Sequence, residues 1–333
     1  MGVVEGPAVN LARRVIEKYS LKPPVDINAL IKKHAELIIL DIPMNGVDGV
    51  TLNLKISGKY PKVILSNSMP QFRQRFTLAH ELGHILIPWH TGNIIDVVNE
   101  GESPEADSYW QTEAEANSFA AELLMPRDWI INLISDRSTD YAKVHGLISE
   151  KCEVSLLAAA IRFKEILPSN LIYACEHANA VEFSGKTNGT IANALGWGSA
   201  FPKKPFAYCE KHYTAIIGKR VLHWWLLPKT ISIKVTDDRG WREILCHILN
   251  DLGVTDTDEL KKLKSSINGV FAYANSSAKR QDNYSVDTVI SACVQRFSDK
   301  DGFEEFVSHQ DFQAFIVDRV NAIFQQTTKF QRL

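Results

Sequence analysis

The chain has 333 residues, of which 45% are hydrophobic and 23% charged, and its formal net charge at pH 7 is −2. This balance is typical of a soluble globular protein with two or three domains. No strong basic field is present, which excludes non-specific nucleic-acid binding by the whole surface and leaves only a local basic patch open.

The sequence carries no sign of a membrane or export segment. Its apolar stretches fall short of the roughly 18 to 20 residues that a span needs, and no charged-then-apolar leader opens it. We therefore expect a cytoplasmic protein without a membrane partner. The five cysteines are odd in number, scattered and free of any C-x-x-C motif, which favours reduced thiols. Cys209 and His212 have the spacing of half a zinc site but no matching half, so a buried thiol is expected there.

Two helices and three strands are expected ahead of residue 70. The helices span residues 7–19 and, after the Pro23-Pro24 break, residues 26–34. Runs that are β-branched or alternate in polarity, separated by turn signals with glycine, predict strands at residues 37–42, 50–55 and 63–65. These runs predict a small sheet.

The most informative motif is H-E-x-x-H at His80, Glu81 and His84, in a helix that is apolar on nearly every side. Residues four apart lie one turn above each other, so both imidazoles can reach one tetrahedral zinc. Glu81 then lies beside the open position of the metal, where a carboxylate can take a proton from water and return it to a leaving amine. The motif predicts a zinc peptidase. The alternative is a pair of core histidines with Glu81 in a salt bridge.

A catalytic zinc needs a third protein ligand, and His90 is the first candidate. It follows His84 by six residues, as in the metzincin pattern H-E-x-x-H-x-x-G-x-x-H. Ile87 replaces the turn glycine, however, and Pro88 ends the helix, so the chain does not readily swing back to the metal. His90 is therefore predicted to lie at the rim of the site or behind its ligands.

Glu113 is the second candidate, in a helix pattern that begins at Trp110 and stops before Pro126. Helical spacing puts Glu113 on an apolar, alanine-rich stripe and puts Glu115 and Glu122 on the opposite side, so only Glu113 is expected to point inward. A carboxylate on such a stripe needs a charged partner, and zinc is the obvious one. The alternative is an ion pair with a buried arginine, for which the candidates are Arg73 and Arg75.

Two segments together resemble the ImmA/IrrE family of metallopeptidases. They are R-F-T-L-A-H-E-L-G-H at residues 75–84 and E-x-x-A-N at residues 113–117, which continues to Met125-Pro126. The resemblance covers roughly residues 7 to 165 and fades towards the C terminus. It implies a zincin-like core with a small mixed sheet, in which His80, His84 and Glu113 bind zinc and Glu81 is the general base. The site residues agree with the helical-face argument.

The resemblance also implies a substrate. Family members cleave a helix-turn-helix repressor or an antitoxin, which derepresses genes of a mobile element, a toxin pair or a stress response, and we expect such a partner here as a separate chain. In zincin-like enzymes an exposed sheet edge binds the substrate as an added strand, and we expect one of the three strands to do so.

The segment between His90 and Trp110 reads as a connector of about twenty residues, longer than most loops. Its acidity predicts either a gate that favours a basic substrate segment or, more commonly, a solvated loop. Its carboxylates are Asp96, Glu100, Glu102, Glu105 and Asp107.

Residues 141–166 predict two short helices that split near residues 152–155 and resemble the helix-turn-helix-like module of the family. Lys143, Lys151, Arg162 and Lys164 form a thin basic face, so both DNA contact and simple packing on the core stay open.

The remainder predicts a C-terminal α/β domain. Strands are expected at residues 171–174, 181–183, 214–217, 221–227 and 231–235, and helices at residues 241–252, 258–267, 286–297 and 303–324. Its position suggests regulation or partner recognition, and a domain that merely completes the fold is the alternative. The whole chain is thus expected to be α+β, with a zincin-like peptidase domain at 1–138, the helical module at 139–167 and the C-terminal domain at 168–333.

The sequence therefore predicts a zinc-dependent endopeptidase. Manganese or iron would accept the same ligands. The competing class is a non-catalytic regulator that binds a repressor or DNA. The candidates for supporting the ligands or stabilising the oxyanion are His90, Tyr109 and Asn117.

Overall fold

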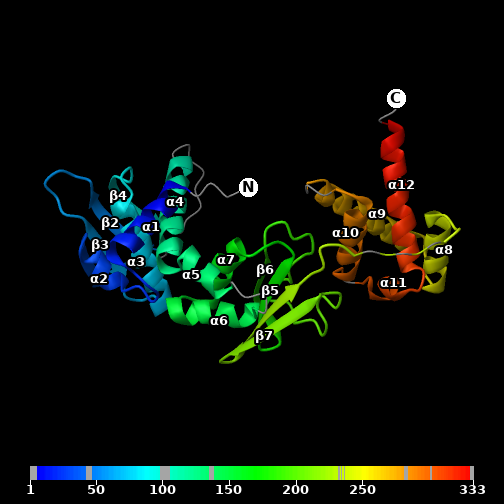
Figure 1. The fold of residues 1–333 in the computed structure, drawn as a ribbon, viewed down its shortest axis with the longest axis horizontal. Coiled ribbons are helices and arrows are strands. Elements are labelled where there is room, and N and C mark those ends of the chain that lie inside the picture. Colours follow the sequence, from blue (N-terminus) through cyan, green and yellow to red (C-terminus); the bar gives the residue numbers. More distant parts are fainter. Residues whose placement is uncertain are drawn as a thin grey trace. The chain divides into compact units, whose positions relative to one another are not determined.

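A computed structural model describes residues 6–42, 47–97, 106–134, 139–231, 233, 235, 237–280, 284–300 and 302–330. The chain divides into an N-terminal unit, Met1–Ile166, and a C-terminal unit, Leu167–Leu333. Each unit contains helices and a four-stranded sheet, so the fold is α+β, as predicted (Figure 1). The predicted boundary between a peptidase core and a helical module stays a prediction.

The sheet of the N-terminal unit is small and mixed, with the strand order β1-β3-β2-β4. β1 (Glu36–Leu40) runs parallel to β3 (Lys62–Ser66). β2 (Val47–Leu54) is antiparallel to both β3 and β4 (Gly92–Val97). The first three strands overlap the predicted ones. β4 was not predicted, because it lies within the segment that reads as a connector.

Helix α3 (Gln71–Leu86) lies between this sheet and α4 (Ala106–Leu124). α1 (Pro7–Tyr19) packs on α4, and the short α2 (Ile27–Ile31) packs on α3. α2 begins where the side chain of Asp26 accepts a hydrogen bond from the backbone N–H of Ala29. Because α3 is covered on both sides, it is apolar around most of its circumference, as the sequence indicated.

Gly83 allows α3 and α4 to approach closely. A Cβ atom at this position would lie 3.2 Å from the ring of Phe119 and 3.3 Å from the Cα of Ala116. These distances are shorter than comfortable van der Waals contacts, so the two helices depend on a missing side chain in α3 and a small one in α4. The same pair of helices carries the predicted metal ligands.

Three further helices complete the N-terminal unit. α5 (Arg127–Leu133) was not predicted, whereas α6 (Tyr141–Cys152) and α7 (Leu156–Ile166) match the predicted pair. Glu153 ends α6 in the left-handed conformation, with φ of 51°, which produces the predicted break.

The prediction that Glu122 points outward is wrong. Its side chain is only 2% exposed and forms ion pairs with Arg162 of α7 and, at 3.1 Å, with Arg13 of α1. Arg162 also donates to the backbone carbonyl of Met125 at 3.1 Å. Arg162 is therefore a buried residue that joins α7 to α4. It does not belong to an exposed basic face, although the sequence predicted this.

The C-terminal unit begins with an antiparallel sheet of strand order β6-β5-β8-β7. Its strands are β5 (Leu171–His177), β6 (Ala180–Lys186), β7 (Lys211–Ile217) and β8 (Arg220–Leu226). All four overlap predicted strands. A fifth strand, expected at residues 231–235, is not formed at the described residues 231, 233 and 235.

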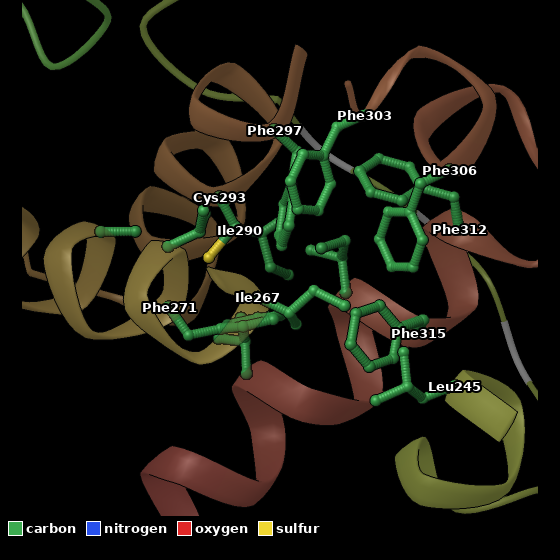
Figure 2. Close-up of a cluster of buried hydrophobic side chains, with 14 of the residues drawn as sticks. Leu245, Ile267, Phe271, Ile290, Cys293, Phe297, Phe303, Phe306, Phe312 and Phe315 are labelled. Atoms are coloured by element: carbon green, nitrogen blue, oxygen red, sulfur yellow. The ribbon is translucent and has the colours of Figure 1, made fainter. Parts of the chain in front are cut away.

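The rest of the C-terminal unit is helical, with a core rich in phenylalanine (Figure 2). Its helices are α8 (Trp241–Asp251), α9 (Thr257–Lys279), α10 (Val286–Ser298), α11 (Glu304–Ser308) and α12 (Phe312–Phe330). The rings of Phe306 and Phe315 meet edge to face at 5.8 Å. The single helix expected at residues 303–324 is in fact two, because His309 adopts an extended backbone (φ −66°, ψ 139°) between α11 and α12.

Over the described part of the chain, no helix has both the length and the apolar character that are needed to cross a membrane.

Candidate metal centre

The two histidines of the H-E-x-x-H motif face one another on α3. Their Nε2 atoms lie 2.8 Å apart, and their side chains are 5% and 0% exposed. Glu113, from α4, brings its Oε2 to 3.1 Å from Nε2 of His80 and its Oε1 to 3.4 Å from Nε2 of His84. One ligand atom from each residue lies within 4.8 Å of the other two. The structure thus brings His80, His84 and Glu113 into one group that can hold a metal ion.

The other ring nitrogen of His80 is held by Asn117. Nδ1 of His80 lies 3.0 Å from Oδ1 of Asn117, one helical turn after Glu113 on α4. An amide oxygen only accepts, so the ring donates through Nδ1–H and keeps its lone pair on Nε2. Asn117 therefore orients His80 from behind.

His84 is oriented by a longer chain of hydrogen bonds. Its Nδ1 lies 2.9 Å from Nδ1 of His90, whose Nε2 lies 3.1 Å from Oε2 of Glu115. Because the carboxylate of Glu115 accepts, His90 donates to it through Nε2–H and accepts from His84 through Nδ1. His84 is thus left with a lone pair on Nε2, directed at Glu113.

Glu115 was predicted to lie on the outer side of α4, and this prediction is wrong. Its carboxylate accepts hydrogen bonds from Nε1 of Trp89 at 2.6 Å and from His90. Burial raises the pKa of Glu115, but these bonds lower it more, so the pKa falls below its ordinary value. Burial lowers the pKa of His90, although Glu115 opposes the shift. Both groups keep the protonation states that the chain of hydrogen bonds requires.

Glu81 lies under the sheet and is 1% exposed. Its Oε2 accepts a hydrogen bond from the hydroxyl of Thr51 on β2. A Cβ atom at Gly49, on the same strand, would overlap the Glu81 carboxylate. The strand therefore fixes this side chain in two ways, through a donor at Thr51 and through space left free at Gly49.

Lys55, which directly follows β2, is another residue near the site that the sequence did not predict. Its Nζ donates to the carbonyls of His84 and Ile87, both at 2.7 Å, where α3 ends. A cation at the C terminus of a helix is stabilising, and burial lowers the pKa of this amine to about 8. Neither Lys55 nor Thr51 belongs to the H-E-x-x-H motif, and no spacing in the sequence connects them to it.

The two arginines considered as alternative partners of Glu113 have partners elsewhere. Arg73 forms an ion pair with Asp48. Arg75 pairs with Glu153 at 3.1 Å and donates to the carbonyl of Val25 at 3.0 Å. Of these candidate partners, the two histidines are the ones whose Nε2 atoms lie beside the Glu113 carboxylate, at 3.1 and 3.4 Å.

The donor set fits a zinc-class ion. Two neutral imidazoles, each with its Nδ1–H accepted by another group, and one carboxylate form the ligand set of many catalytic zinc sites. Tyr109 lies on α4 with its ring centroid 5.6 Å from that of Trp110. His90 and Asn117 support the ligand rings from the Nδ1 side, so they do not face the position that a substrate carbonyl would take.

The acidic connector is shorter than predicted, since β4 and the start of α4 take up part of it. Glu100, Glu102 and Glu105 lie outside the described residues. The gating prediction stays a prediction.

The family model for the IrrE N-terminal-like domain matches residues 35–164. Two relatives are named radiation response metalloprotease IrrE. The one from Deinococcus deserti is 27% identical over 154 residues, 44% of this chain and 54% of that protein. The one from Deinococcus radiodurans is 27% identical over 139 residues, 39% of this chain and 42% of that protein. The alignments thus span about half the length of these two relatives.

A third relative is the uncharacterized immunity region protein 2 of Bacillus phage phi105. It is 28% identical over 160 residues, which cover 45% of this chain and 90% of that protein. The matched residues include both active-site helices, α3 and α4, and most of the N-terminal unit. Over residues 35–164, the chain is therefore similar to the ImmA/IrrE family.

Proposed function

We propose that this protein is a zinc-dependent endopeptidase that cleaves a regulatory protein. The observation that carries the proposal is the convergence of His80, His84 and Glu113 from two helices, with the carboxylate of Glu81 buried beside them. Structural ion pairs do not require two imidazoles with both Nδ1 atoms bonded from behind.

When bound, the ion would act as a Lewis acid on water and on the scissile carbonyl. The chain supplies the rest. Glu81, which follows the first ligand in sequence, is placed to hold a proton on its carboxylate and to return it to the leaving amine. The Thr51 hydroxyl keeps this side chain in one orientation, so that little reorganisation is needed as the proton moves.

The substrate is proposed to be a helix-turn-helix repressor or an antitoxin in the cytoplasm, whose loss derepresses transcription. The support is indirect: one relative is named for a radiation response and another for a phage immunity region. An extended substrate segment would pair with an open sheet edge. The sheet has two edges, β1 and β4, and β4 is the neighbour of β2, the strand that holds Glu81.

The first prediction concerns Glu81→Gln, which keeps the shape of the side chain but removes the proton acceptor. We expect cleavage of a candidate repressor or of a casein substrate to fall by about 100-fold or more, because general bases contribute on this order. Zinc content, measured by mass spectrometry of the purified protein, should stay at the wild-type value. Unchanged cleavage by Glu81→Gln would refute the proposal.

The second candidate is a non-catalytic regulator that binds a repressor or DNA. Its support is the predicted resemblance of the helix pair α6 and α7 to a helix-turn-helix-like module. Burial of Arg162 leaves Lys143, Lys151 and Lys164 for the proposed DNA face, and such a small basic surface favours packing over DNA contact. A regulator of this kind would keep its effect on reporter expression in cells that carry Glu81→Gln.

A further inference from the structure

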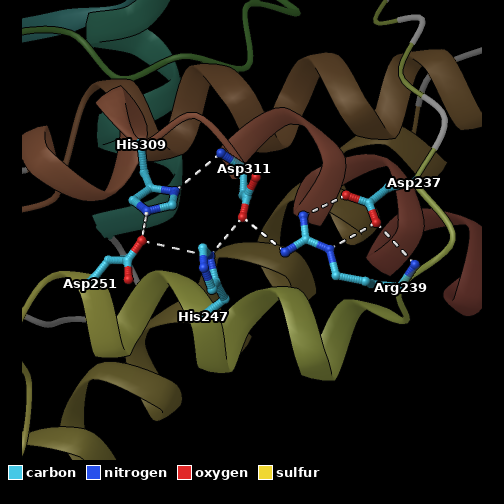
Figure 3. A network of polar contacts seen from close by, with 6 residues as sticks. All are labelled: Asp237, Arg239, His247, Asp251, His309 and Asp311. Atoms are coloured by element: carbon cyan, nitrogen blue, oxygen red, sulfur yellow. Dashed lines mark hydrogen bonds and ion pairs between the residues drawn. The ribbon is translucent and has the colours of Figure 1, made fainter.

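A second cluster of metal-ligand side chains lies in the C-terminal unit, outside the region of family resemblance. A nitrogen of His247, a carboxylate oxygen of Asp251 and a nitrogen of His309 all lie within 4.8 Å of one another (Figure 3). His247 and Asp251 are four residues apart on the last turn of α8, so they share one face. His309 comes from the extended corner between α11 and α12.

The separation between Asp251 and His309 resembles those of the first site. Asp251 Oδ2 lies 3.1 Å from Nε2 of His309, and in the first site the Glu113 carboxylate lies 3.1 and 3.4 Å from the two Nε2 atoms. Ligands about 2.0 to 2.1 Å from one tetrahedral zinc ion stand a little over 3 Å apart, so these pairs need only small adjustments.

The cluster also has an outer partner of the kind that metal-binding histidines use. Nδ1 of His247 lies 2.9 Å from Oδ2 of Asp311, and the carboxylate accepts its N–H. Arg239 holds that carboxylate in place, with Nη1 at 3.2 Å, and is itself anchored to Asp237 at 2.7 Å. His247 thereby keeps its Nε2 lone pair for a ligand role.

We propose that His247, Asp251 and His309 form a second binding site for a divalent ion of the zinc class. Two imidazoles and one carboxylate are donors that zinc, cobalt and nickel accept, whereas magnesium and calcium prefer oxygen ligands alone. The ion would tie the last turn of α8 to the corner between α11 and α12. Since the side chains of His247 and Asp251 are both 46% exposed, the ion can enter and leave from solvent.

Without metal, the same groups form hydrogen bonds, and one of these bonds must change when an ion binds. The backbone N–H of Asp311 donates to Nδ1 of His309 at 3.1 Å, which puts the proton of the neutral ring on Nε2, next to Asp251. For an ion to bind Nε2, this proton would move to Nδ1, and the N–H of Asp311 would then donate to water instead of to the ring. We therefore expect a weaker site than the first, in which the hydrogen bonds of both imidazoles already place the ring proton on Nδ1.

The experiment measures how many cobalt and zinc ions the full chain binds after removal of metal with a chelator. Equilibrium dialysis and the visible absorption of bound cobalt should give two equivalents for the wild type. One equivalent is expected for His247→Ala/His309→Ala, one for His80→Ala/His84→Ala, and none for all four substitutions. Cobalt affinity at the second site should fall about 10- to 100-fold in Asp311→Asn, which keeps the shape but not the charge of the outer partner.

Matched controls separate a lost site from lost folding. His177→Ala removes a histidine of β5 outside the cluster and should leave two equivalents bound. Asp251→Asn alters one ligand without changing its shape and should weaken the second site, while its thermal unfolding without metal should match that of the wild type.

The proposal is overturned if every equivalent that the wild type binds survives in His247→Ala/His309→Ala, or if the second site keeps its affinity in Asp251→Asn. A metal equivalent that is lost only in His80→Ala/His84→Ala belongs to the first site. The experiment therefore tests the two sites independently.

Discussion

His84 is held by a continuous series of hydrogen bonds that runs through His90 to Glu115. The carboxylate at its end fixes the proton on every ring in the series, and thus fixes which nitrogen of His84 is available to a metal. Ile87 stands where the metzincin pattern has glycine, and this prevents His90 from becoming a metal ligand. The same turn places His90 behind the ligand His84. A histidine near an H-E-x-x-H motif can therefore support the site without touching the metal.

Removal of this support should weaken the site without abolishing it. We expect His90→Ala to lower zinc affinity about 10- to 100-fold, as for other outer partners of metal ligands, and Asn117→Ala to act similarly through His80. Competition with a chromogenic chelator measures the affinity. Ser118→Ala, on the exposed side of α4, is the control and should change nothing. An unchanged affinity for His90→Ala would mean that the ring only fills space.

A substitution at Gly49, on β2, would test whether the position of the Glu81 carboxylate matters for cleavage. In Gly49→Ala the added methyl group would overlap the Glu81 carboxylate and approach the Thr77 methyl group at 2.8 Å, so we expect Glu81 to be displaced. Peptide cleavage should then fall at least about 10-fold, since small misplacements of a catalytic group are costly, while zinc content stays constant. Gly269→Ala, where nothing lies within 4 Å of the new methyl group, is the matched control and should keep full activity.

At the scale of elements, the metal ligands depend on how closely α3 and α4 pack. His80 and His84 belong to one helix and Glu113 to the other, and Gly83 lies at their contact. Any side chain that separates the helices therefore moves the carboxylate away from the imidazoles. Small residues at a helix contact thus have a function here as well as a packing role.

Gly83→Leu is expected to lower the free energy of unfolding of the N-terminal unit by about 1–3 kcal/mol, because it overfills a packed contact. Zinc affinity should fall as well, although no ligand is changed. Chemical denaturation followed by circular dichroism, together with the chelator competition, measures both quantities. A variant that loses stability but keeps wild-type affinity would show that the helix spacing does not control the site.

One buried group in each unit makes a pH-dependent contribution to stability, and the two contributions should run in opposite directions. Burial lowers the pKa of His145 in the N-terminal unit from 6.5 to about 4. The unfolded chain takes up this proton below pH 6.5, so the stability contributed by the neutral ring is present above that pH and is lost as the pH falls through about 4. Burial raises the pKa of Asp299 in the C-terminal unit from 3.8 to about 7. Its contribution is present below pH 3.8 and is lost as the pH rises through about 7.

Hydrogen exchange in urea, read separately for peptides of each unit, tests this contrast in the full chain. The stability difference between the wild type and His145→Gln should rise between pH 4 and pH 7 in the N-terminal unit. The difference between the wild type and Asp299→Asn, which still accepts a hydrogen bond from Tyr208, should fall in the C-terminal unit. Each change should be on the order of 1 kcal/mol per pH unit. A difference that stays constant with pH would contradict the assignment.

The sequence by itself determined the parts of this protein that depend on local pattern. Helical periodicity gave α1, α3 and the pair α6 and α7, because an apolar stripe recurs wherever a helix covers a core. The H-E-x-x-H spacing and the position of Glu113 on an apolar stripe predicted the metal-ligand residues that the fold brings together. The reason is that spacing along a helix fixes which side chains share a face.

Features that depend on contacts between residues distant in sequence could be found only in the folded structure. Glu115 and Glu122 lie on the side of α4 away from Glu113, yet both have partners distant in sequence, which periodicity on one helix cannot reveal. Glu115 is bonded to Trp89 and His90 and Glu122 to Arg13 and Arg162. β4 forms because β2 offers it an edge, although its own sequence reads as a connector. Thr51 and Gly49 reach Glu81 through sheet packing alone. In the C-terminal unit, His247 and His309 are 62 positions apart, and only the packing of α8 beside the corner of α11 and α12 brings them together.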